Sequence, residues 1–182
     1  MRRITYNAPV TLTFSIIALI VLILHFYTHG ETTRLFFSVY RSPIASPLFF
    51  VRLFGHVLGH AGWEHLMGNL LLLLLLGPML EEKYGSVPLL KMIIITALIT
   101  GILNLLLFPA VLLGASGIVF MMILLSSFAN AKKNELPLTV ILIAVLYIGR
   151  EVLAAFVIED NISRMTHIAG GLTGAWFGFR IK

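Results

Sequence analysis

Cysteine is absent from this 182-residue chain, and charged residues are scarce. The lack of cysteine excludes thiol catalysis, disulfide bonds and cysteine-ligated metal centres, and it leaves the redox compartment open. Asp, Glu, Lys and Arg make up only 12% of the residues, whereas a soluble domain carries roughly a quarter. Hydrophobic residues make up 59%. Lipid rather than water must therefore face much of the surface, and we expect an integral membrane protein.

The chain also lacks a basic stripe, although its formal net charge is +5. The 13 Lys and Arg residues are scattered along the sequence, and many of them flank apolar segments. A nucleic-acid-binding protein gathers its basic residues on one face, whereas a membrane protein places them at the ends of its spans. The lipid bilayer is therefore the expected partner, and no nucleic acid is expected.

Six apolar segments approach the length of about 20 residues that a spanning helix needs. They cover residues 10–26, 63–80, 87–107, 114–129, 136–157 and 166–179. Residues 27–47 are too polar to span, and residues 48–58 are short and interrupted by Arg52, which predicts a re-entrant or interfacial piece. The sequence predicts one all-α, polytopic domain over residues 1–182, a bundle of six transmembrane helices.

The charged turns between these segments predict the orientation, because six spans place both termini on one side. That side carries Arg2, Arg3, Lys83, Lys132, Lys133, Arg180 and Lys182. The other side carries Arg34, Arg41, Arg52 and Arg164 together with Glu31, Glu159 and Asp160. Cytoplasmic loops carry the excess of Lys and Arg, so both termini are expected in the cytoplasm. The turns before Gly114 and Thr166 then lie on the outer face.

The first candidate for chemistry is Gly114-Ala115-Ser116-Gly117, which opens the fourth apolar segment. Glycines on both sides permit a sharp entry and leave the serine hydroxyl uncovered. At a helix N-terminus, the free N–H groups of Ser116 and its neighbours point to where an oxyanion would form. The same four residues are also typical of a capping serine beside packing glycines, so this motif alone does not establish catalysis.

The second candidate is His167, at the start of the sixth apolar segment. Gly170 and Gly174 form a GxxxG pair, which allows another helix to approach closely. His167 lies three residues before Gly170 and shares its face. If the fourth segment packs on this glycine face, His167 and Ser116 come within reach of each other. Ordinary helix packing without catalysis is the alternative.

The third candidate is a run of His56, His60, His65 and Asn69. His65 and Asn69 are four residues apart and share a helical face, and both side chains can donate to a developing oxyanion. Zinc binding is the rival interpretation, because histidine is a common zinc ligand. No cysteine or carboxylate completes a ligand set, and Glu64 points to another face than His65. We therefore expect no metal.

Arg150 and Glu151 stand within the fifth apolar segment. Adjacent residues of a helix do not face each other, so they are not a self-contained ion pair. Ionisable residues inside a membrane are functional candidates by default. The sequence does not identify their partners: they could line a water-accessible cavity, or the span could begin and end elsewhere.

The order of these landmarks resembles the bacterial-type, six-span core of the rhomboid family of intramembrane serine proteases, over nearly the whole chain from Val10 onward. They are, in order, Arg52; His56, His60, His65 and Asn69; Glu81 and Gly85; the serine motif at 114–117; and His167 with Gly170 and Gly174. Two positions depart from the family pattern: Phe120 stands where tyrosine is frequent, and Val51 precedes the loop arginine instead of tryptophan.

The resemblance implies a protease with a Ser116–His167 dyad, no acidic third member and no cofactor. It implies an oxyanion site from the backbone of Ser116 and Ala115 and the side chains of His65 and Asn69. Packing by Gly117, Phe120, Gly170 and Gly174 would support the dyad. The expected substrates are single-span transmembrane proteins, cleaved near the outer face of a prokaryotic inner membrane. Two alternatives stay open: a non-catalytic rhomboid-like protein that binds transmembrane helices, and a small proton-coupled transporter.

Overall fold

The computed structural model describes residues 3–129, 131–132, 135–155 and 161–181. These residues form helices and loops, and their only strand-like pairing is an isolated bridge between Val39 and Leu112. The all-α prediction is confirmed. The elements are α1 (Pro9–Tyr27), α2 (Glu31–Phe36), α3 (Pro47–Gly55), the 3₁₀ turn η1 (His56–Leu58), α4 (Trp63–Tyr84), α5 (Ser86–Leu107), α6 (Ser116–Ser126), α7 (Leu138–Ile143), the π-helix η2 (Ala144–Ile148), α8 (Gly149–Ala155) and α9 (Asn161–Arg180).

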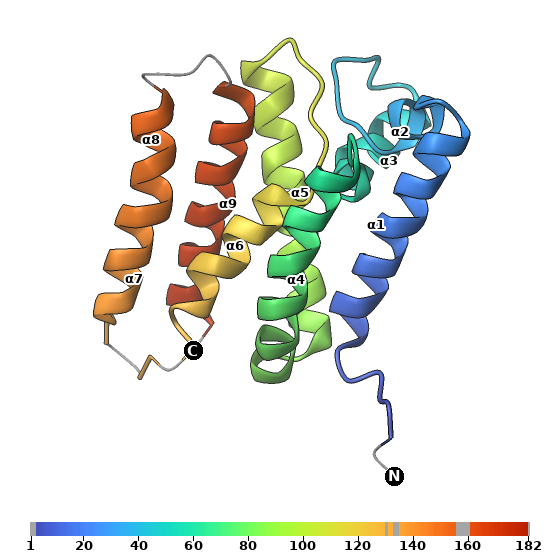
Figure 1. Cartoon of the computed structure of the whole chain (residues 1–182). Coiled ribbons are helices and arrows are strands. Elements are labelled where there is room, and N and C mark those ends of the chain that lie inside the picture. Colours follow the sequence, from blue (N-terminus) through green and yellow to red (C-terminus); the bar gives the residue numbers. More distant parts are fainter. Residues whose placement is uncertain (1–2, 130, 133–134, 156–160, 182) are drawn as a thin grey trace.

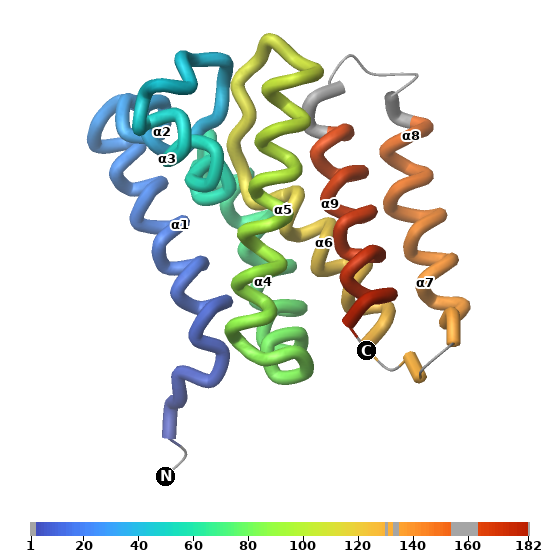
Figure 2. The backbone as a smooth tube through the Cα atoms, turned by 180° about the vertical axis from the view of Figure 1, so that it is seen from behind, coloured from blue at the N-terminus to red at the C-terminus, as the bar shows by residue number. Residues whose placement is uncertain are grey.

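Within the described part of the chain, α1, α4 and α5 are long and apolar enough to cross a bilayer. Their outward leucines are open to the surroundings: Leu71 and Leu75 of α4 are 70% and 67% exposed. Figures 1 and 2 show the long helices side by side, with α2 and α3 beside the end of α1. Helix α1 begins and α9 ends at the opposite end of the bundle. This surface is that of an integral membrane protein.

Two helices extend beyond the predicted segments. Helix α4 continues through Glu81 and Lys83 to Tyr84, and it ends where Gly85 adopts a φ of +87°. The charges do not end the helix because both have internal partners. Glu81 accepts hydrogen bonds from the N–H groups of Val10 and Thr11 at the start of α1, and Lys83 donates to Phe128 and Ala129. Helix α9 begins at Asn161, five residues before the predicted start.

Helix α6 is shorter than the predicted segment 114–129. Its 11 residues span about 16 Å, roughly half the hydrocarbon thickness of a bilayer. Figure 1 shows that it begins well inside the bundle, after the loop 108–115 has descended from the end of α5. The start of α6 therefore lies in the interior of the bundle and not at its outer surface.

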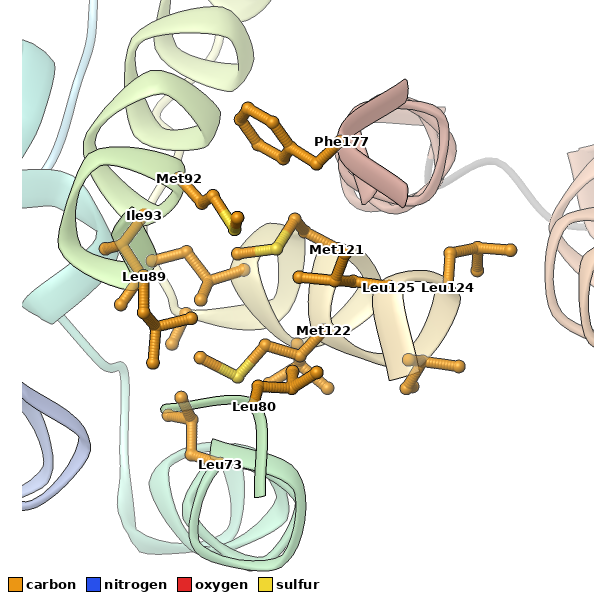
Figure 3. Packing of buried hydrophobic residues seen from close by; sticks show 14 of the residues in the cluster. Leu73, Leu80, Leu89, Met92, Ile93, Met121, Met122, Leu124, Leu125 and Phe177 are labelled. Carbon is orange, nitrogen blue, oxygen red and sulfur yellow. The ribbon is translucent and has the colours of Figure 1, made fainter. Parts of the chain in front are cut away.

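The hydrophobic core surrounds α6. Figure 3 shows Met121, Met122, Leu124 and Leu125 of α6 among side chains from the neighbouring helices. These neighbours are Leu73 and Leu80 of α4, Leu89, Met92 and Ile93 of α5, and Phe177 of α9. Each is at most 5% exposed. A short helix with apolar contacts on all sides has a fixed position, and so does the residue that begins it.

Helices α6 and α9 touch backbone to backbone. A Cβ added at Gly170 would overlap the carbonyl oxygen of Gly117 and lie 2.8 Å from its carbonyl carbon. One turn further on, a Cβ at Gly174 would overlap the carbonyl oxygen of Met121. The matching order of these contacts means that the two helices run parallel. The glycine face of α9 therefore packs on α6. The sequence alone had left open whether this helix or another lies on that face.

Candidate functional site

The loop that leads to Ser116 is held by backbone hydrogen bonds from two distant segments. Val39 and Leu112 exchange N–H···O bonds of 2.9 and 3.0 Å, and the N–H of Gly114 donates to the carbonyl of His56 at 2.9 Å. These partners satisfy polar backbone that would otherwise be costly to bury. The loop can therefore carry Ser116 into the bundle, where it is the half-buried first residue of α6.

Gly114 makes the final turn of this loop with a φ of +123°, which strongly favours glycine. A Cβ at this position would lie 2.7 Å from Nε2 of His65. The His65 ring, in the first turn of α4, therefore lies directly against the loop that delivers Ser116. Glycine is required here both for the backbone conformation and for the approach of the imidazole.

The N-terminus of α6 offers free backbone donors at Ser116. The first hydrogen bond of the helix runs from Val119 N–H to the carbonyl of Ala115, the residue before the helix. The N–H groups of Ser116, Gly117 and Ile118 precede it and have no acceptor within the helix. They form the positive end of the helix, which is a favourable place for a developing negative charge.

His167 is positioned by the same pair of helices. Its ring stacks on Phe120, with 4.2 Å between centroids and 5° between ring planes. The preceding residue, Thr166, lies on Gly117: a Cβ at Gly117 would be 3.1 Å from Thr166 Cγ2. Gly117 directly follows Ser116, and Phe120 lies one turn after it. Because Thr166 and His167 contact these two residues, His167 lies beside Ser116. Phe120 holds the ring by packing alone and offers no hydroxyl.

Helix α8 contributes Glu151, for which the sequence analysis identified no partner. Oε1 of Glu151 lies 3.2 Å from Nδ1 of His167, and the two side chains are only 12% and 17% exposed. The resemblance implied no acidic third member, and the structure shows a carboxylate beside His167. The residue that faces it comes from a different helix, which helical spacing cannot reveal.

His65 and Asn69 form the wall contributed by α4. The His65 ring lies against Gly114, two residues before Ser116. Asn69 is buried, and its Nδ2 donates to the carbonyl of His65 at 3.0 Å and to Nε2 of His60 at 3.2 Å. Both amide hydrogens of Asn69 are thus already engaged. His60, which the sequence treated only as one of a run of histidines, holds this amide in place.

The other histidines of this region serve the fold. Nδ1 of His60 lies 3.2 Å from the carbonyl of Leu58, so it carries the proton and leaves Nε2 to accept from Asn69. His56 is buried between the Leu53 carbonyl and the Thr100 hydroxyl. Among the described residues, no three His, Asp or Glu side chains gather in a way that could hold a metal ion.

These features define a class: a polytopic membrane protein with a polar centre inside an apolar bundle, formed by the starts of α4 and α6 together with His167 of α9. A family model described as the Rhomboid domain matches residues 48–182, and the chain belongs to the rhomboid family. It is also similar to Rhomboid-related protein 1 of Caenorhabditis elegans, with 31% identity over 131 residues. The match covers 66% of this chain and 36% of that protein, so the chain spans about a third of the length of its curated relative.

Proposed function

We propose that this protein is an intramembrane serine endopeptidase that cuts transmembrane segments of other proteins, with Ser116 as nucleophile and His167 as general base. One observation carries the proposal. The parallel contact of α6 and α9 puts a serine at a free helix N-terminus beside a histidine whose ring is held on Phe120. A nucleophile, a base and oxyanion donors are the parts that acyl transfer requires.

The reaction follows from these groups. Neutral His167 accepts the Ser116 Oγ proton through Nε2 while Oγ attacks the scissile carbonyl carbon, and the carbonyl oxygen becomes an oxyanion. The C–N bond then breaks, and the imidazolium gives its proton to the leaving amine. Water attacks the carbonyl carbon of the resulting acyl-enzyme and gives a proton to His167. The bond between that carbon and Ser116 Oγ then breaks, His167 returns the proton to Oγ, and the carboxylic acid leaves. No metal or cofactor takes part.

The oxyanion donors in this proposal come from two sides. The backbone at Ala115 and Ser116 supplies N–H groups where α6 begins, and the His65 imidazole supplies a donor from α4. Asn69 also has a structural role in this proposal. Its hydrogen bonds to His60 and to the His65 carbonyl hold the first turn of α4 in place. For Asn69 to donate to the oxyanion, it must give up one of these bonds.

His65→Ala is therefore expected to reduce kcat more than Asn69→Ala. Loss of an oxyanion donor typically reduces kcat by about 10²–10³-fold, and the backbone donors remain in both variants. The measurement is kcat and KM on a model transmembrane substrate, with Met67→Ala as control because Met67 is on the same helix and 56% exposed. Unchanged kinetics in both histidine and asparagine variants would show that α4 does not line the oxyanion site. Chelators should have no effect, and inactivation that zinc reverses would favour a metal site.

The membrane setting fits single-span transmembrane proteins as substrates. The proposed site lies inside a bundle with an apolar outer surface, so a substrate that already resides in lipid reaches it most directly. A helical peptide bond is shielded from attack, so the substrate must unwind near the site. We propose that both termini are cytoplasmic and that the site opens to the outer side, as the distribution of Lys and Arg indicates. A prokaryotic cell membrane is proposed from the resemblance to the bacterial-type core.

The test is covalent labelling by a serine-directed fluorophosphonate, followed by mass spectrometry to identify the modified residue. The purified wild type should be labelled at Ser116 and should cleave a reconstituted model transmembrane substrate. Ser116→Ala should do neither. A protein that binds the substrate but is neither labelled nor cleaves would be a non-catalytic helix-binding member of the family. Proton-coupled uptake into vesicles without cleavage would indicate a transporter instead.

A further inference from the structure

The helix run from α7 to α8 presents one face to the proposed dyad. Tyr147 meets Phe120 edge to face, with ring centroids 5.9 Å apart and an interplanar angle of 81°. The next residue, Ile148, contacts Gly171 of α9, where an added Cβ would lie 3.3 Å from Ile148 Cδ1. Glu151, four residues after Tyr147, reaches Nδ1 of His167 at 3.2 Å. Packing of Tyr147 on α6 and of Ile148 on α9 thus orients the Glu151 carboxylate toward His167.

The π-helix η2 sets this orientation. It occupies residues Ala144–Ile148, directly before α8, and so ends three residues before Glu151. A π turn contains one residue more than an α turn, and one residue corresponds to about 100° around a helix. The side chains after η2, including that of Glu151, are therefore rotated about the helix axis relative to their directions in a continuous α-helix. Single π turns of this kind occur frequently at functional sites.

The burial of Glu151 requires a partner. Its side chain is 12% exposed on a helix within an apolar segment, and an isolated carboxylate in such surroundings is costly. Arg150 is adjacent, exposed and on another face, so it cannot serve. Among the described residues, the basic group beside the Glu151 carboxylate is the imidazole of His167, at 3.2 Å. The opposite edge of that ring is needed at Ser116.

We propose that Glu151 is a positioning residue for His167, the general base of the proposed Ser116–His167 pair. This inference rests on the proposed function. The carboxylate accepts the Nδ1–H of His167, which leaves Nε2 unprotonated and free to take the Ser116 proton. When the imidazolium forms, Glu151 stabilises its charge and remains ionised, while the Nδ1 proton stays on the ring. A carboxylate in this place fixes the tautomer and the orientation of the base.

The test compares Glu151→Gln, Glu151→Asp and Arg150→Gln in the full-length protein. Glutamine keeps the size of the side chain and removes its charge, aspartate keeps the charge, and Arg150→Gln controls for any change to α8. We expect Glu151→Gln to lower kcat by about 10–100-fold, by analogy with the loss of a partner that orients a metal-ligating histidine. The KM should change less than about twofold, and fluorophosphonate labelling of Ser116 should slow in parallel with kcat. Aspartate should recover part of the loss, and Arg150→Gln should behave as wild type.

Three results would overturn the inference. The first is a normal kcat per folded molecule in Glu151→Gln together with a lower folded yield, which would make the pair purely structural. The second is a raised KM at constant kcat, which would place Glu151 in substrate binding. The third is an equal loss in the glutamine and aspartate variants. Ser116→Ala, run in parallel, separates this inference from the proposed function: cleavage by that variant refutes the protease, whatever Glu151 does.

Discussion

Ser116→Ala and His167→Ala are each expected to abolish cleavage while the protein remains folded and inserted in the membrane. Loss of either member of such a unit costs on the order of 10⁴–10⁶ in kcat, because the nucleophile is not activated without its base and the base has no role without the nucleophile. Ser116 is a half-buried residue at a helix start, so its loss removes a hydroxyl and leaves the core around α6 intact.

The double variant Ser116→Ala/His167→Ala provides the sharper test. If the two residues act as one unit, the double variant should be about as inactive as either single variant. The measurement is the cleavage rate per folded molecule, with folding followed by thermal unfolding. Ser126→Ala is the matched control, because Ser126 lies at the other end of α6 and its hydroxyl donates to the carbonyl of Ile123. Strictly additive losses would contradict a shared mechanism.

The arrangement around Phe120 and His167 illustrates how much the sequence could predict. Apolar runs located the helices, because the bilayer fixes both their length and their composition. The glycine spacing identified the face of α9 that another helix approaches, and the structure places α6 on it. Phe120, one turn after Ser116, is the residue on which the histidine stacks. The helices and the glycine face followed from composition and spacing within one segment, which a sequence displays directly, whereas the place of Phe120 followed from the family resemblance.

The partner of Glu151 could not be predicted, because it lies on another helix and not within one local segment. The signal was present as a carboxylate in an apolar segment, but its partner is 16 positions away in the sequence on another helix. Its orientation also depends on the π turn η2, and no residue pattern in 144–148 indicates an inserted residue. The engagement of Asn69 with His60 has the same origin, because it joins a loop to a helix.

The depth of Ser116 was also beyond the sequence. The apolar run 114–129 suggested a full span that begins at the membrane surface, whereas α6 begins inside the bundle. The reason is the bonding of the preceding loop to Val39 and to the His56 carbonyl, which lets polar backbone enter the interior. These partners come from segments more than 50 residues away. Local patterns give the polarity of a segment, but tertiary hydrogen bonds decide how deep it lies.

Gly170→Val is expected to remove most of the activity by separating α6 from α9. The first atom of the new side chain would overlap the carbonyl oxygen of Gly117, which is backbone and cannot turn aside. The helices must therefore move apart at the level of Ser116 and His167. A displacement of about 1 Å in a reacting pair can cost on the order of 10² in rate. Valine is apolar, so insertion into the membrane should survive.

The position of the substitution along α9 makes this prediction specific. Gly178→Val meets the ring of Phe128, a side chain that can reorient, and it lies more than two turns further from His167. Its effect on the cleavage rate should be smaller, with Gly174→Val in between because its obstacle is the backbone carbonyl of Met121. Gly68→Ala is the control, since no atom lies within 4 Å of its added Cβ. The measurement is the cleavage rate per folded molecule across the four variants. If Gly170→Val cleaves normally, the glycine face does not set the distance between Ser116 and His167, and the stacking on Phe120 must hold the histidine by itself.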